Sequence, residues 1–129
     1  ILLTGHSLGG GMASLAGASY HLPAISFSGP GLKYNSDRFG ISLDSIEQHV
    51  TTISPDNDVV PLVDDNDGTN QDISCPYSSP ISCHMIPVTA VTLYENCGDP
   101  RGRDWSRAVQ NMLDTYGDVS SDSSTSDAS

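Results

Sequence analysis

Short apolar runs alternate with small-residue and polar segments in the first half of the chain. Residues 1–4 and 24–27 are apolar and end at glycine-containing turns, and residues 49–53 are β-branched, so all three predict strands. Residues 12–18 are small and helix-compatible, and residues 42–48 fit a short helix. The order strand, helix, strand, helix, strand predicts parallel strands joined by crossover helices, and therefore an α/β layer fold.

The second half is less regular. Residues 56–72 contain six aspartates and no basic residue, which predicts a solvated loop, and residues 73–83 should be irregular. Residues 83–97 fit two patterns, since the run 88–94 is β-branched enough for a strand. We favour a helix there, because one helical face would collect four apolar residues: Ile86, Ala90, Leu93 and Cys97.

A clearer helix is predicted over residues 104–116, where Trp105, Val109 and Met112 share a face and Gly117 fits the C-terminal stop. The last dozen residues contain six serines and three aspartates, a composition that cannot bury a core. We therefore divide the chain into a domain over residues 1–116 and a disordered tail over residues 117–129.

Charge and length restrict the classes of function. Five basic residues against sixteen acidic ones give a net charge of −11, which argues against nucleic-acid binding. No apolar run approaches the ~18–20 residues of a membrane span. The chain opens at Ile1, within a predicted strand, so we expect the N-terminal half of its domain to be absent.

The strongest chemical motif is Gly5-His6-Ser7-Leu8-Gly9, which matches the pattern G-x-S-x-G between a strand and a helix. A serine at such a sharp turn has a strained backbone, and its neighbours two residues away must lack side chains. Its hydroxyl then stands at the carboxyl end of the sheet. The N–H of Leu8 should be one donor to a developing oxyanion.

With the residues around it, this motif resembles the nucleophile elbow of class 3 (fungal-type) triacylglycerol lipases, which are α/β-hydrolases. Residues 22–30 are similar to the next strand of that family, and the resemblance covers roughly residues 1–100. It implies the C-terminal half of an α/β-hydrolase domain, with Ser7 as nucleophile and no cofactor or metal.

A serine nucleophile needs a base and an orienting carboxylate, and in α/β-hydrolases the acid follows the serine and the histidine follows the acid. Asp56 and Asp58 both follow the predicted strand 49–53. Asp58-Val59-Val60-Pro61 resembles the family segment whose aspartate is the triad acid, so we favour Asp58.

The base should be His84. His21 and His49 precede the acid, and His6 lies inside the elbow, where it cannot easily reach back to Ser7. His84 follows Cys83, and related lipases of some protists and fungi have a Cys-His pair here. The predicted triad is therefore Ser7, Asp58 and His84.

The three cysteines form no C-x-x-C pair, and Cys83-His84 alone is a poor metal site. A disulfide could join Cys83 to Cys75 or to Cys97, and either bond would fix the segment that carries His84. The alternative is free buried thiols. A disulfide would indicate a secreted protein, or one in a vacuolar or lysosomal lumen.

Two classes of function fit these residues. The leading hypothesis is a serine hydrolase of carboxylic esters, a triacylglycerol lipase, with a phospholipase or a feruloyl-type esterase as variants on the same elbow. The competing hypothesis is a truncated, inactive lipase-like fragment that serves as a binding or relic module. The expected partner is a lipid or another ester, with no nucleic acid.

Overall fold

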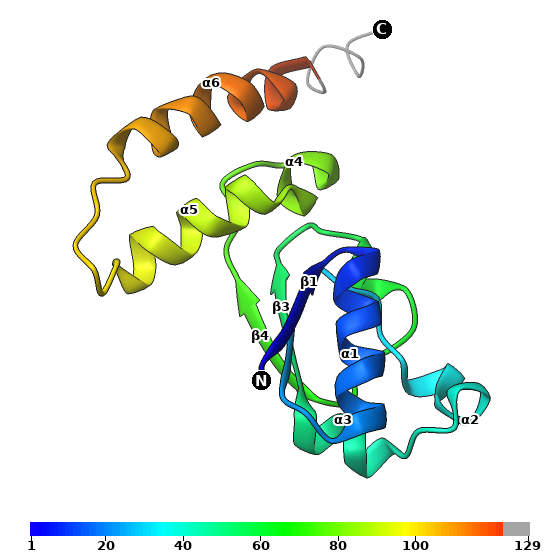
Figure 1. Ribbon diagram of the computed structural model, residues 1–129. Helices are drawn as coiled ribbons and strands as arrows, with labels where there is room; N and C mark the ends of the chain where they lie inside the picture. The colour runs from blue at the N-terminus through cyan, green and yellow to red at the C-terminus, as the bar shows by residue number, and fades with distance from the viewer. Residues whose placement is uncertain (123–129) are drawn as a thin grey trace, which may run out of the picture. The chain divides into compact units, whose positions relative to one another are not determined.

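The computed structural model describes residues 1–122 and contains a sheet of four strands in the order β1-β2-β3-β4 (Figure 1). The strands are β1 (Leu3–His6), β2 (Ala24–Phe27), β3 (Val50–Pro55) and β4 (Thr69–Ile73). β2 pairs in parallel with both β1 and β3, and the arrows of β3 and β4 point the same way (Figure 1). The predicted α/β class with a parallel sheet is confirmed.

The described chain forms two compact units. The first contains residues 1–54 and 58–72, and the second contains residues 55–57 and the chain from Ile73 onward. Within residues 1–122, no helix has both the length and the apolar character that crossing a membrane requires.

In the first unit, the helix α1 (Leu8–Tyr20) packs on the sheet through small residues. A Cβ added to Gly17 would lie 2.7 Å from the Ala24 Cβ, so only glycine permits this approach of α1 to β2. The core beside it consists of Ala18, Leu32, Ile41, Ile46 and Val50. Burial of one such side chain as large as Ile46 contributes about 1.5–3 kcal/mol.

The remaining elements of the first unit are short. The 3₁₀ turn η1 (Lys33–Asn35) leads into α2 (Ser36–Phe39), and α3 (Leu43–His49) confirms the short helix predicted over residues 42–48. The hydroxyl of Ser42 caps α3 by accepting a hydrogen bond from the Ser45 N–H at 3.1 Å.

The prediction of a solvated loop over residues 56–72 is wrong in part. This segment contains the 3₁₀ turn η2 (Val60–Leu62) and nearly all of β4. Of the five residues of β4, four are exposed and Ile73 is half-buried. An edge strand that buries so little has no alternation of apolar and polar residues, so its hydrophobicity pattern gives no signal.

The second unit contains α4 (Pro80–His84), α5 (Ile86–Cys97) and α6 (Ser106–Asp122). The segment 73–83, predicted to be irregular, thus contains most of a short helix, which starts at Ser79-Pro80 with the serine as cap and the proline at the first helical position. The helix favoured over residues 83–97 is confirmed as α5. The residues that this helix buries are not those of the apolar face but Val88, Thr89, Val91 and Thr92.

The helix predicted over residues 104–116 is confirmed as α6, with Met112 buried in the core of this unit. The helix continues through Gly117 to Asp122, so the predicted stop is wrong; a glycine inside a helix costs only about 1 kcal/mol. Residues 117–122 of the predicted tail therefore belong to α6, and residues 123–129 lie outside the described residues.

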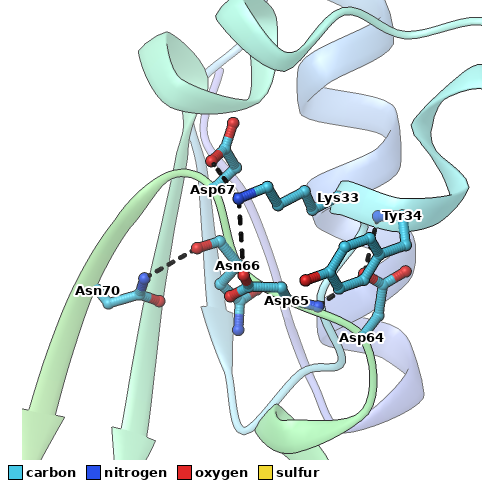
Figure 2. Close-up of polar contacts among 7 residues, drawn as sticks. All are labelled: Lys33, Tyr34, Asp64, Asp65, Asn66, Asp67 and Asn70. Carbon is cyan, nitrogen blue, oxygen red and sulfur yellow. Dashed lines mark hydrogen bonds and ion pairs between the residues drawn. The ribbon is translucent and has the colours of Figure 1, made fainter.

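The acidic segment before β4, residues 64–67, is joined to η1 by polar contacts (Figure 2). The Asp64 carboxylate accepts hydrogen bonds from the Tyr34 N–H at 2.9 Å, the Asn35 amide at 2.7 Å and the Asp65 N–H at 2.6 Å. Partial burial opposes ionisation of Asp64, but these hydrogen bonds outweigh it and lower its pKa. Lys33 adds ion pairs with Asp65 at 3.7 Å and Asp67 at 3.5 Å.

We expect Asp64→Ala to lower the free energy of unfolding by about 1–2 kcal/mol, because three donors lose their acceptor. The lowered pKa means that this stabilisation is complete above the ordinary aspartate value of 3.8 and is lost as the pH falls through the lowered pKa. Urea unfolding at a series of pH values checks both statements. The exposed Asp72 provides the control: Asp72→Ala should change the stability by less than about 0.5 kcal/mol. Equal losses in the two variants would contradict the role of Asp64.

Candidate functional site

Ser7 occupies the single residue between β1 and α1. Its backbone has φ 57° and ψ −127°, a conformation that L residues rarely adopt. The Ser7 N–H donates to the Phe27 carbonyl oxygen at 2.9 Å, and the Ser7 carbonyl oxygen accepts from the Gly11 N–H at 3.1 Å. Strained backbone of this kind costs about 1–3 kcal/mol and concentrates at functional sites. The sharp strand-to-helix turn expected of the motif is therefore present.

The turn brings the backbone of α1 against the end of β1. A Cβ added to Gly5 would lie 2.2 Å from the Gly9 carbonyl oxygen, which no packing adjustment can accommodate. A Cβ added to Gly9 would meet no atom within 4 Å. The expectation that both glycines must lack a side chain is thus right for Gly5 and wrong for Gly9. The backbone carbonyl of Gly9 occupies the space that a side chain at Gly5 would need, whereas a side chain at Gly9 itself would meet nothing.

Leu8 opens α1, so its N–H is one of the first helical donors, which have no partner within the helix. The Leu8 side chain is 71% exposed and that of Met12 is 64% exposed. The turn is thus bordered by apolar surface on the helix side. Such a combination, a strained serine beside helical N–H groups, can stabilise negative charge on an oxygen atom.

Asp58 lies in the loop that follows β3, in the same unit as Ser7. It is only 4% exposed, whereas Asp56 is exposed. The Asp58 carboxylate accepts a hydrogen bond from the Val60 N–H at 3.0 Å, an Asx-type contact that directs the loop into η2. Asn57, with φ 66°, makes the bend between the two aspartates. Burial and this contact separate Asp58 from the solvated aspartates of the loop.

His84 is the last residue of α4 and is half-buried in the second unit. The preceding Cys83 is fully buried and forms a disulfide with Cys75, with the two Cα atoms 5.7 Å apart. The sequence left open whether Cys83 pairs with Cys75 or with Cys97, and the structure contains the Cys75–Cys83 disulfide. Cys97 is a free, exposed thiol, which contradicts the alternative of free buried thiols.

Two of the predicted site residues, Ser7 and Asp58, follow parallel strands of one unit, and both lie at the carboxyl edge of the sheet. His84 belongs to the other unit, so its meeting with them is part of the proposal below. Ser28, at the end of β2, also has a positive φ of 55° and is completely buried. Sequence reasoning missed it, because Gly29-Pro30 alone accounted for the end of that strand.

The second unit also contains an open hollow of about 410 Å³ beside the C-terminal end of α5. Its aromatic wall is Tyr94 stacked on Trp105, with the ring centroids 5.2 Å apart. Asp99 holds this wall by accepting hydrogen bonds from Arg103 Nε at 2.6 Å and Trp105 Nε1 at 2.8 Å. Together with the Arg101 N–H, these donors lower the pKa of Asp99 to about 2. The apolar face predicted for α5 lines this hollow through Ala90, Leu93 and Cys97.

Comparison with known proteins finds short local similarities. Over 31 residues, 24% of this chain, the sequence is 61% identical to proteins named "Putative lipase ATG15" from Debaryomyces hansenii and Vanderwaltozyma polyspora. Over 54 residues, 41% of this chain, it is 43% identical to the protein of the same name from Candida albicans. The matched stretches span only 5%, 6% and 9% of those relatives. No family model matches the chain. The similarity supports a lipase-like relation over part of the chain.

The two glycines of the turn give a matched pair of variants. We expect Gly5→Ala to destabilise the protein by about 1–3 kcal/mol, because the new methyl group overlaps the Gly9 carbonyl. Gly9→Ala should be neutral or stabilising by up to about 1 kcal/mol, because it adds no contact and removes a glycine from a helix. Urea unfolding of both variants measures the difference. A larger loss for Gly9→Ala than for Gly5→Ala would contradict the geometry of the turn.

Proposed function

We propose that the chain carries the nucleophile, the acid and the base of a serine hydrolase that cleaves carboxylic esters, and that the enzyme is a triacylglycerol lipase. The observation that carries the proposal is the backbone of Ser7, which has a positive φ at a turn from a parallel strand into a helix. In this proposal the sheet is the C-terminal part of an α/β-hydrolase domain. The local similarity to proteins named as lipases supports it.

In the proposed mechanism, Ser7 Oγ attacks the ester carbonyl carbon while the imidazole of His84 takes the hydroxyl proton. The carbonyl oxygen becomes an oxyanion, which the Leu8 N–H helps to stabilise. His84 then returns the proton to the leaving alcohol, and an acyl-enzyme ester remains on Ser7. His84 takes a proton from water, the resulting hydroxide attacks the acyl carbon, and His84 returns the proton to Ser7 Oγ as the ester bond breaks and the fatty acid leaves. No cofactor takes part.

Asp58 orients the imidazole in this mechanism. Its strand, β3, is separated from β1 by β2 alone, and two interstrand spacings amount to about 10 Å. One imidazole fits between a serine and a carboxylate across such a gap. The burial of Asp58 supports its choice over the exposed Asp56, because a carboxylate away from water holds a histidine more firmly.

His84 enters the mechanism from the second unit. The disulfide between Cys75 and Cys83 fastens the residue next to it, so α4 holds the base on a cross-linked support and not on a free loop. The same bond supports an oxidising compartment, which we propose to be the extracellular space or a vacuolar or lysosomal lumen.

The proposed substrate is a lipid ester. Apolar residues follow both proposed catalytic positions of the first unit: Leu8 and Met12 after Ser7, and Val59, Leu62 and Val63 after Asp58, each more than half exposed. Since both stretches follow the carboxyl ends of parallel strands, an acyl chain would find apolar surface at this edge. A phospholipid or a feruloyl ester would use the same machinery, and assays with the three ester classes separate them.

Labelling with a fluorophosphonate probe tests the nucleophile. We expect the protein at its full natural length to be labelled at Ser7, because only an activated serine reacts quickly with such a probe. Ser7→Ala should abolish the labelling, and Ser14→Ala, a buried serine on α1, should retain it. Labelling that persists in Ser7→Ala, or an unlabelled parent protein, would overturn the proposal in favour of an inactive binding module.

The two aspartates after β3 test the acid. Asp58→Asn should lower kcat for ester hydrolysis by about 10⁴, because the imidazole loses the carboxylate that fixes its tautomer. Asp56→Asn should change activity by less than about tenfold, because this side chain is exposed. Steady-state kinetics with a soluble short-chain ester measures both. A loss of about 10⁴ in kcat for Asp56→Asn, with Asp58→Asn nearly unchanged, would show that the acid is Asp56 and not Asp58.

A further inference from the structure

The apolar face predicted for α5 lies outside the core of the second unit. The residues of α5 in that core are Val88 and Val91, whereas Ala90, Leu93 and Cys97 line the open hollow of about 410 Å³ at the C-terminal end of the helix. These three residues are three and four positions apart, so they share one face and extend over about 10 Å of helix. The face therefore offers a strip of apolar surface to a ligand.

A second wall makes the hollow concave. It comes from the link between α5 and α6, residues 98–105 (Figure 1). Trp105, at the end of this link, stacks on Tyr94 of α5, with the ring planes at 19°. Binding sites for small molecules are hollows of about 300–1,000 Å³ lined mainly by apolar and aromatic side chains, with a few polar groups that fix the ligand. The shape and the lining therefore favour a small ligand over a protein partner.

Arg103 supplies such a polar group in the lining of the hollow. Its Nε donates a hydrogen bond to the Asp99 carboxylate at 2.6 Å, and its Cζ lies 5.9 Å from the centroid of the Trp105 ring. The side chain of Asp99 is 3% exposed and that of Arg103 is 60% exposed, so the carboxylate is the inner partner and the guanidinium the outer one. These contacts hold the guanidinium in place before a ligand binds.

The Arg103 guanidinium retains hydrogen-bond donors for a ligand. A guanidinium has five N–H groups, and within residues 1–122 the Nε–H is the one that is hydrogen-bonded. The two Nη groups form the planar fork that binds a carboxylate through two parallel hydrogen bonds. A carboxylate receptor beside an apolar strip fits an amphiphile that has a carboxylate head and a hydrocarbon tail.

The distribution of charge also favours an anion at this position. Residues 95–107 contain three acidic and three basic residues, so this segment is neutral and the net charge of −11 comes from the rest of the chain. Glu95 and Asp104, the acidic residues of the segment besides Asp99, are exposed, so solvent screens their repulsion of an anion.

We propose that this hollow binds a fatty acid, with its tail along Ala90 and Leu93 and its carboxylate on the Nη groups of Arg103. The site is separate from the proposed base, because His84 precedes α5 and the hollow lies at the other end of this helix of twelve residues, about 18 Å long. Binding requires no hydrolysis, so the site does not depend on the proposed hydrolase. In an active lipase it would retain a product of the reaction.

Calorimetry with decanoate on the protein at its full natural length tests the head of the site. We expect Arg103→Gln to weaken decanoate binding about tenfold, because the carboxylate loses charge-assisted hydrogen bonds. Arg107→Gln removes the same charge from an exposed residue outside the lining and should bind decanoate like the parent. Decanol, which has the same tail and no carboxylate, should bind equally to the parent and to Arg103→Gln. Equal decanoate affinities of the two arginine variants, or no binding by the parent, would overturn the proposal.

A second pair of variants tests the tail. Ala90→Leu places a larger side chain in the hollow and should weaken the binding of decanoate and of decanol about tenfold. Ala108→Leu, at an exposed position of α6, should bind both like the parent. Parent-like binding by Ala90→Leu would show that the tail lies elsewhere and would overturn the site.

The Cys97 thiol provides a test that needs no variant, because it is free, exposed and part of the lining. Decanoate should slow the reaction of Cys97 with N-ethylmaleimide, measured by mass spectrometry of the peptide that contains it. A rate that decanoate leaves unchanged would overturn the site even if the variants failed to fold. A thiol that does not react in the protein at its full natural length would show that another part of the protein covers the hollow, and would overturn the proposal as well.

Discussion

The structure of the first unit depends on how closely the chain can pass itself at the turn from β1 into α1. The Gly9 carbonyl occupies the space that a side chain at position 5 would need, and the Ser7 N–H is fastened to β2. Once this turn is made, α1 must lie against the sheet, and only small residues allow it to do so. The strain at Ser7 and the packing of α1 on the sheet are thus consequences of the same turn.

Where a segment buries apolar surface on a regular period, its fold could be predicted from the sequence. This holds for β2, β3 and α6. The prediction fails for β4, whose residues are almost all exposed. This strand is defined by its backbone hydrogen bonds, which do not require a hydrophobic pattern in the sequence. The prediction fails in another way for α5, where threonines, not the apolar residues in helical register, complete the buried face.

In the candidate site, too, local features could be predicted from the sequence and features that depend on the fold could not. The motif around Ser7 is local, so five consecutive residues were sufficient to predict its turn. Asp58 was favoured over Asp56 only by the resemblance of residues 58–61 to a family segment. Their burial, in contrast, could not be predicted from the sequence, and the fold shows that Asp58 is buried and Asp56 is exposed. The pairing of Cys83 is a three-dimensional choice between two sequence-compatible partners. The shared contact of His21 and His49 with Ser45 could not be predicted for the same reason, since these residues meet only through the packing of α1 on α3.

The polar character of β4 has a consequence for behaviour at high concentration. β4 forms one border of the described sheet, and a border strand with free backbone groups is a template on which a second molecule can add a strand. Here that border presents Thr69, Asn70, Gln71 and Asp72. Repulsion between the carboxylates of two such borders, in a chain with a net charge of −11, opposes intermolecular strand pairing. The residues that made this strand hard to recognise also protect the sheet from aggregation along that border.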